Sequence, residues 1–284
     1  MINIFLAVLA VVAGLCALVW VIGGREPVYQ VSRGTPAFVA AIKYADGPVE
    51  PVLAPGVTEV WRGDVRHGLV GPAASYWDRF LVLTGGNAGE MPLALGQAVA
   101  DAYVAEVSLV RPPKLAFGFI RLLQATGLRG IPAGDTWHGG DPPGLRPEML
   151  PSPENVAWLL AQPANYSPAM FNFLKYRETA DYADARAADA GSGEAAYGRY
   201  GMVAMQTVMR TGGKLHFAGR VKAVLHEAAG WDMGSEWHDV AVMSYPTPGA
   251  ILSMERVDAY RAALKHRDAG LDATIVTATQ ATIR

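Results

Sequence analysis

Two nine-residue stretches share one pattern: PAFVAAIKY at 36–44 and PAMFNFLKY at 168–176. Each begins with Pro-Ala, continues through apolar residues, and closes on an apolar residue, Lys and Tyr. Such a density of aliphatic and aromatic residues is typical of β-strands. The likeness predicts that one folding unit occurs twice in the chain.

Three further matches follow in the same order along the chain. They are VRHGLVG at 65–71 with VLHEAAG at 224–230, SYWDRFLVL at 75–83 with SEWHDVAVM at 235–243, and DAYVAEV at 101–107 with DAYRAAL at 258–264. Four collinear matches are hard to produce by chance, so the sequence predicts an internal duplication.

Strand and helix patterns are clearest in the second copy. Strands are predicted at 169–176, 214–225, 238–245 and 273–280, and helices at 194–211 and 250–265. This order, β-α-β-β-α-β, is that of a ferredoxin-like unit. The first copy indicates strands near 37–44, 58–66, 78–84 and 115–121 and a helix near 89–109, and it lacks the first helix.

The predicted fold class is therefore α+β, with two ferredoxin-like repeats. The chain divides into an anchor at 1–24, a degenerate repeat at 36–123, a connector at 124–167 and a second repeat at 168–284. The connector is rich in Pro and Gly. A short helix is predicted to begin there, with Ser152 as its N-cap and Pro153 in its first turn.

Residues 2–22 read INIFLAVLAVVAGLCALVWVI and carry no charge. At a rise of 1.5 Å per residue this run would be about 31 Å long, close to the hydrocarbon thickness of a bilayer. The sequence thus predicts a single transmembrane helix with the lipid bilayer as its partner. Arg25, Arg33 and Lys43 follow it, and this positive charge favours a cytoplasmic location for the globular part.

Composition excludes several classes of function. The net charge of the 284 residues is −2, which gives no electrostatic basis for binding nucleic acid. Cys16 is the single cysteine, so neither an intramolecular disulfide nor a cysteine-ligated zinc or iron–sulfur site is expected. We expect no cofactor and no metal.

The second copy also resembles a known family. The runs FNFLKY, AAYGRYG, GGKLHFAGRVKAVL, WHDVAVMSYPTPGAILSM, DAYRAALKHRDAGL and ATIVTAT lie between residues 168 and 281. In order and spacing they resemble the dimeric α/β-barrel superfamily, and within it the family named domain of unknown function 1330. The resemblance implies that the two repeats pair their sheets face to face within one molecule, with a ligand between the sheets.

The resemblance further implies three pocket positions. The family's Asn on the first strand matches Asn172, its Gly-Arg on the second strand matches Arg220, and its His-Arg after the second helix matches His266 and Arg267. Arg220 is expected to hold an anionic or carbonyl oxygen, Asn172 to form a hydrogen bond, and His266 to act as acid or base.

A structural interpretation stands beside this one. Arg220 would pair with Asp239 or Glu227, and His266 would interact with the last carbonyls of the preceding helix. Both interpretations stay open from the sequence.

Alternation along 214–226 separates two faces of the predicted strand. Phe217, Gly219, Val221, Ala223 and Leu225 form an apolar face suited to helices, and His216, Arg220, Lys222 and His226 share the other face. In a paired barrel the polar face would point inward, where polar groups need partners or a ligand. Lys222 and His226 are therefore predicted ligand-binding residues as well.

Two functions follow as hypotheses. The first is a membrane-anchored α/β barrel that binds a small molecule, with metal-free acid–base catalysis as an extension. The alternative is a noncatalytic accessory or scaffold subunit of a larger membrane protein complex. An enclosed cavity lined by Arg220 and His266 favours the first, and a filled barrel with an exposed apolar patch favours the second.

Overall fold

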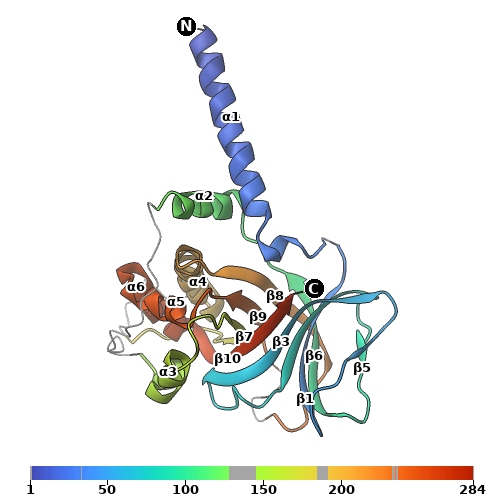
Figure 1. Cartoon of the computed structure of the whole chain (residues 1–284). Coiled ribbons are helices and arrows are strands. Elements are labelled where there is room, and N and C mark those ends of the chain that lie inside the picture. Colours follow the sequence, from blue (N-terminus) through green and yellow to red (C-terminus); the bar gives the residue numbers. More distant parts are fainter. Residues whose placement is uncertain are drawn as a thin grey trace.

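The computed structural model describes residues 2–32, 34–127, 145–183, 191–231, 234 and 236–283, without the side chains of residues 2–5, 7 and 283. Within this part of the chain, eight strands close into a barrel whose neighbours all pair antiparallel (Figure 1). The first half contributes β1 (Ala37–Tyr44), β3 (Val57–Val70), β4 (Arg79–Gly85) and β6 (Val99–Leu109). The second half contributes β7 (Pro168–Tyr176), β8 (Lys214–His226), β9 (Asp239–Ser244) and β10 (Leu271–Ile283).

The order around the barrel is β1-β4-β3-β10-β7-β9-β8-β6. The four strands of each half are neighbours in one shared order: β6-β1-β4-β3 in the first half and β10-β7-β9-β8 in the second. Two pairings join the halves, β3 with β10 and β6 with β8. This shared strand order is consistent with the predicted internal duplication, which remains a prediction.

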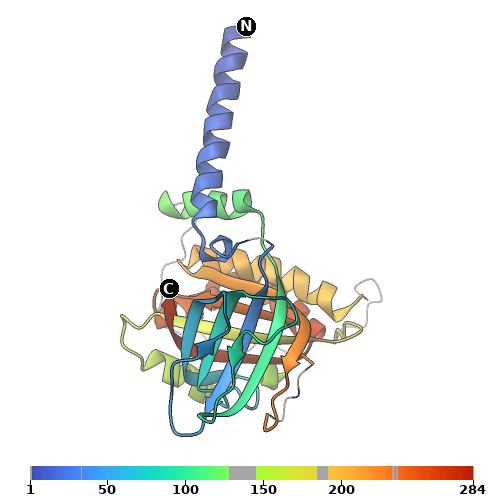
Figure 2. The same ribbon diagram turned by 90° about the vertical axis from the view of Figure 1, so that its right-hand side faces the viewer.

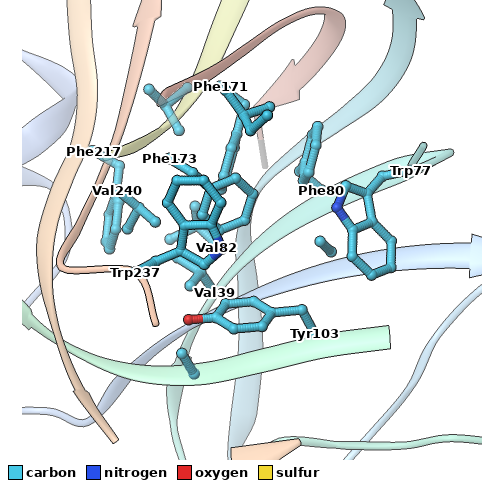
Figure 3. Packing of buried hydrophobic residues seen from close by; sticks show 14 of the residues in the cluster. Val39, Trp77, Phe80, Val82, Tyr103, Phe171, Phe173, Phe217, Trp237 and Val240 are labelled. Atoms are coloured by element: carbon cyan, nitrogen blue, oxygen red, sulfur yellow. The ribbon is translucent and has the colours of Figure 1, made fainter. Parts of the chain in front are cut away.

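Aromatic side chains fill the barrel interior (Figure 3). Phe80 and Phe171 stack with their ring centroids 4.2 Å apart. Trp231 and Trp237, which follow β8, belong to the same cluster, and their ring centroids are 5.3 Å apart. The interior is therefore a packed core.

Polar atoms contribute little to that core. The ring nitrogens of Trp77 and Trp231 and the hydroxyl of Tyr103 are buried without a hydrogen-bond partner among the described residues. Each such group costs about 1–3 kcal/mol. Apolar and ring–ring contacts must offset that cost.

Asp101 anchors the segment that carries Trp231 into the barrel core. Its carboxylate accepts hydrogen bonds from the hydroxyl of Tyr76 at 2.7 Å and from the backbone amides of Ala102, Ala229 and Gly230 at 2.9 Å each. Burial opposes ionisation, but these hydrogen bonds together lower the pKa of Asp101 below its usual range.

We expect Asp101→Ala to lower the free energy of unfolding by about 2 kcal/mol, because the amides of Ala229 and Gly230 lose their acceptor. Urea unfolding followed by tryptophan fluorescence measures this loss, since Trp231 directly follows the anchored amides. The matched control is Asp46→Ala, which removes an exposed carboxylate after β1 and should change stability by less than about 0.5 kcal/mol. Equal effects would contradict the anchoring role.

Helices cover the outer face of the second half (Figures 1 and 2). They are α3 (Pro153–Leu160), α4 (Gly193–Arg210), α5 (Pro248–Leu252) and α6 (Asp258–Gly270), with the 3-10 turns η2 (Pro147–Met149) and η4 (Ser253–Arg256). Helix α3 begins as predicted, because the hydroxyl of Ser152 accepts from the amide of Asn155. Ser192 and Thr247 cap α4 and α5 in the same way.

The outer face of the first half has a different cover. A ribbon of β2 (Val52–Leu53) and β5 (Leu93–Ala94) packs on it through Leu53 and Leu93. Arg62 on this face is buried and paired with Glu50 and Glu59. Within residues 37–109 no helix lies between the strands.

Helix α1 (Ile2–Gly24) projects from the barrel, and α2 (Lys114–Ala125) lies across the end of α1 that is nearest the barrel (Figure 1). The two backbones touch, since a Cβ on Gly118 would lie 1.7 Å from the carbonyl oxygen of Val19. After α1 the chain forms η1 (Pro27–Tyr29), and the buried Glu26 pairs with Arg121 at 2.6 Å.

No helix in the described part of the chain combines the length and the apolarity that crossing a membrane requires. By this criterion the predicted transmembrane anchor at 2–22 is wrong. The predicted single-pass membrane localisation, with a cytoplasmic globular part, is wrong with it.

The predicted fold class is also wrong. Two ferredoxin-like β-α-β-β-α-β repeats with a transmembrane helix were expected, and the chain forms one closed antiparallel barrel of eight strands. The halves join edge to edge through hydrogen bonds, where the family resemblance implied sheets packed face to face. The predicted helix at 89–109 is mostly strand β6, and the predicted strand at 115–121 is part of helix α2.

Candidate functional site: a cavity between the barrel wall and the helices

A cavity of about 270 Å³ lies between the outer wall of the second half and the helices that cover it. One wall comes from β7, β8, β9 and β10, and the opposite wall from α4 and α6. Side chains of α3, α5 and η4 complete it. The cavity is thus outside the barrel, whose interior is filled.

Alternate side chains of β7 point into the barrel core and into the cavity. Phe171 and Phe173 point into the barrel core, whereas Met170, Asn172 and Leu174 line the cavity. A strand with both faces buried needs apolar residues at nearly every position. Asn172 is the polar residue within the buried part of this strand, 168–174.

Small residues on both walls create the space. Gly201 and Ala204 face the cavity from α4, and Ala218, Gly219 and Ala241 face it from β8 and β9. A Cβ on Gly201 would meet a single neighbouring atom within 4 Å, Cε1 of Tyr197 at 4.0 Å. Gly201 therefore leaves open space beside α4, at a cost in helix stability of about 1 kcal/mol relative to Ala.

Two polar groups of the strands are already engaged. Nδ2 of Asn172 donates to the carbonyls of Met170 at 3.0 Å and Ala241 at 3.2 Å. Asp239 accepts from the hydroxyl of Tyr176 at 2.7 Å and from Nε of Arg220 at 3.2 Å. The side-chain oxygen of Asn172 receives no hydrogen bond from the described residues.

Two polar groups of the helices have fewer partners. Arg267 on α6 donates to the carbonyl oxygen of Met149 and has no carboxylate partner among the described residues. The hydroxyl of Tyr197 on α4 has no hydrogen-bond partner in the described part of the chain. Both side chains line the cavity.

Five tyrosines line the cavity, namely Tyr176, Tyr197, Tyr200, Tyr245 and Tyr260. Burial raises the pKa of four of them, Tyr176, Tyr197, Tyr245 and Tyr260, above the usual range. Their hydroxyls are therefore protonated at neutral pH. Those of Tyr176 and Tyr245 already donate to Asp239 and to the sulfur of Met254, so the Tyr197 hydroxyl is the donor available to a bound molecule among the described tyrosines of the cavity.

Of the predicted site residues, Asn172 and Arg267 lie at the cavity. Arg220 is on the outside of the barrel, with half of its side chain exposed, and it pairs with Glu194 and Asp239. The structural interpretation of Arg220 therefore describes its contacts, with Glu194 as a partner that the sequence did not suggest.

The other three predicted residues lie away from the cavity. Lys222 is half exposed and pairs with Glu106. His226 ends β8, opposite Val104 of β6. Nδ1 of His266 is 2.7 Å from the hydroxyl of Tyr182, beside the cavity-lining Arg267 but not part of the lining.

Tyr197 and Gly201 are among the cavity residues that the sequence analysis did not predict. The available signal was Gly201 itself, a glycine inside a predicted helix, with Tyr197 four residues before it and Ala204 three residues after it. The described residues contain no group of three or more His, Cys, Asp or Glu side chains that could hold a metal ion.

No protein-family model and no curated protein matches the chain. Two solved structures are similar to part of it. One, the methylated RPA0582 protein, is 28% identical with a TM-score of 0.40, over 47% of this chain and 92% of that chain. The other, an RPA0582 protein of unknown function from Rhodopseudomonas palustris, is 26% identical with a TM-score of 0.39, over 47% and 94%. Likeness at this level supports neither the predicted superfamily nor an activity.

Proposed function

We propose that the protein binds a small, mainly apolar organic molecule in the cavity between the barrel wall and α4 and α6. The observation that carries this proposal is a space of about 270 Å³ bounded by small apolar residues and a few convergent polar groups. Ligand sites are typically concave, mostly apolar and about 300–1,000 Å³ in volume. A volume near the lower limit favours a small ligand.

Packing of the barrel interior supports this choice of site. Phe80, Phe171 and Phe173 are fully buried and in mutual ring contact. Their rings fill the barrel interior, so a ligand would have to displace them to bind there. The tyrosine-lined cavity has the opposite character, since it encloses a space of about 270 Å³.

Acid–base catalysis by His266 stays a prediction. His266 is held by Tyr182 and does not line the cavity, so the geometry supports binding more directly than it supports a reaction. The groups that would orient a ligand are Arg267, Tyr197 and Asn172.

Gly201→Leu is expected to weaken binding at least tenfold, because the leucine side chain would occupy the cavity. Isothermal titration with the neutral probe 2-naphthamide measures the effect, and mass spectrometry of the purified protein identifies any molecule that copurifies. Both measurements address the same cavity.

Gly198→Leu is the matched control in the same helix. A Cβ at Gly198 would meet no atom within 4 Å, and the residue is exposed, so the substitution should raise helix stability by about 1 kcal/mol and leave binding unchanged. Failure of the native protein to bind any naphthalene probe, or equal binding by both leucine variants, would reject the cavity as the ligand site.

A second candidate is a noncatalytic subunit of a larger complex. The criterion set from the sequence favours it, because the barrel is filled and neither Arg220 nor His266 lines the cavity. Helix α1 favours it, because most of its described side chains are apolar and exposed, among them Leu6, Val8, Leu9, Val11, Val12, Leu15, Leu18, Trp20 and Val21. A stoichiometric protein partner in the same preparation would support this function, and deletion of residues 2–22 should then release that partner.

A further inference from the structure

The charged side chains that line the cavity differ in their hydrogen-bond and ion-pair partners. Asp239 has both Arg220 and Tyr176 as partners, so its charge is compensated. Glu255 also lines the cavity and has an interaction partner of its own. Arg267 differs from both, since its described contact is the carbonyl oxygen of Met149.

A partly buried guanidinium without a counter-charge is costly. Transfer of a charged group out of water is unfavourable unless it is paired and hydrogen-bonded. Guanidinium has five N–H donors in a planar fork, and a single carbonyl satisfies few of them. No described carboxylate forms an ion pair with Arg267, although Asp239 and Glu255 also line the cavity.

Tyr197 places a second donor near this charge. It faces the cavity from α4, while Arg267 faces it from α6, and the charge of Arg267 acts on the Tyr197 hydroxyl. Burial nevertheless raises the pKa of Tyr197, so its hydroxyl stays protonated. An oxygen bound between the two side chains would receive hydrogen bonds from both.

We propose that the molecule bound in this cavity carries a carboxylate, which Arg267 and Tyr197 hold, with its apolar body against Met170 and Val208. A carboxylate fits because its two oxygens match the guanidinium fork and supply the absent negative charge. This inference rests on the proposed function and specifies the chemical class of the ligand.

The test compares two probes that differ in charge but have the same fused rings, 2-naphthoate and 2-naphthamide. Titration calorimetry at neutral pH should show that the native protein binds 2-naphthoate about ten- to a hundredfold more tightly. Arg267→Met should abolish this preference while binding of 2-naphthamide persists. Arg261→Met removes an exposed guanidinium from the same helix and should retain the preference.

Tyr197→Phe keeps the experiment decisive should Arg267→Met fail to fold. It removes one donor and should reduce the preference for 2-naphthoate severalfold with little effect on 2-naphthamide. Equal affinity of the native protein for the two probes would overturn the carboxylate inference and leave the cavity as a ligand site. Survival of the full preference in Arg267→Met and Tyr197→Phe would overturn it as well. Absence of binding by both probes would reject the proposed function itself.

Discussion

Phe173→Ala is expected to lower the free energy of unfolding by about 3–5 kcal/mol. Phe173 is fully buried at the centre of the barrel. Its ring centroid lies within about 6 Å of the rings of Phe80, Tyr103, Phe171, Trp231 and Trp237. Because strands from both halves and the tryptophan segment after β8 all contact it, the cavity left by alanine has few ways to collapse.

Chemical denaturation with circular dichroism as the readout measures this loss. Phe119→Ala is the matched control, because Phe119 on α2 is 55% exposed and should change stability by less than about 0.5 kcal/mol. A loss below about 1 kcal/mol for Phe173→Ala would show that the barrel interior is loosely packed. The interior would then compete with the outer cavity as the place for a ligand.

Strands with strong local signals were predictable from the sequence. The aromatic and aliphatic runs gave strands at 37–44 and 169–176, within one residue of β1 and β7. These strands are buried on both faces, so nearly every residue is apolar and the pattern is unambiguous. How the two sheets join was not predictable, since closure depends on pairing of β3 with β10 and β6 with β8, far apart in sequence.

The repeat itself misled the assignment of 89–109. DAYVAEV matches DAYRAAL in three consecutive residues, yet the first lies in β6 and the second in α6. In β6, Ala102 and Val104 face one apolar cluster while Tyr103 and Ala105 face another, the period of a strand. Periodicity was the better guide there than identity.

The site residues were only partly predictable, because the two faces of β8 point to the opposite sides from those expected. Pairing of β8 with β9 shifts register between Leu215 and Phe217, and Phe217 enters the barrel core. In the sequence, alternation put Phe217 and Arg220 on opposite faces, and the expected paired barrel then placed the polar face inward. The structure keeps the two residues on opposite faces but reverses which face points inward. Asn172 lies on a regular strand and lines the cavity, although the resemblance implied a ligand between paired sheets and this cavity is outside the barrel.

Stability of the native protein is expected to fall by about 2–3 kcal/mol more than that of His216→Gln when the pH is lowered from about 7.5 to about 4.5. Burial, with a smaller contribution from Lys214, lowers the pKa of His216 to about 4, from a usual value of 6.5. The folded state therefore keeps the imidazole neutral while the unfolded chain takes up a proton. Below the unfolded pKa this difference favours unfolding, and the loss grows until the pH reaches the folded value.

Glutamine isolates this contribution because its amide nitrogen occupies nearly the place of Nε2, which is 2.7 Å from Oγ of Ser244. Urea unfolding at both pH values, for the native protein and the variant, cancels the titration of the carboxylates that the two share. A native slope that persists in His216→Gln would mean that His216 becomes protonated in place. The burial of β8 against β9 would then be less complete than the barrel requires.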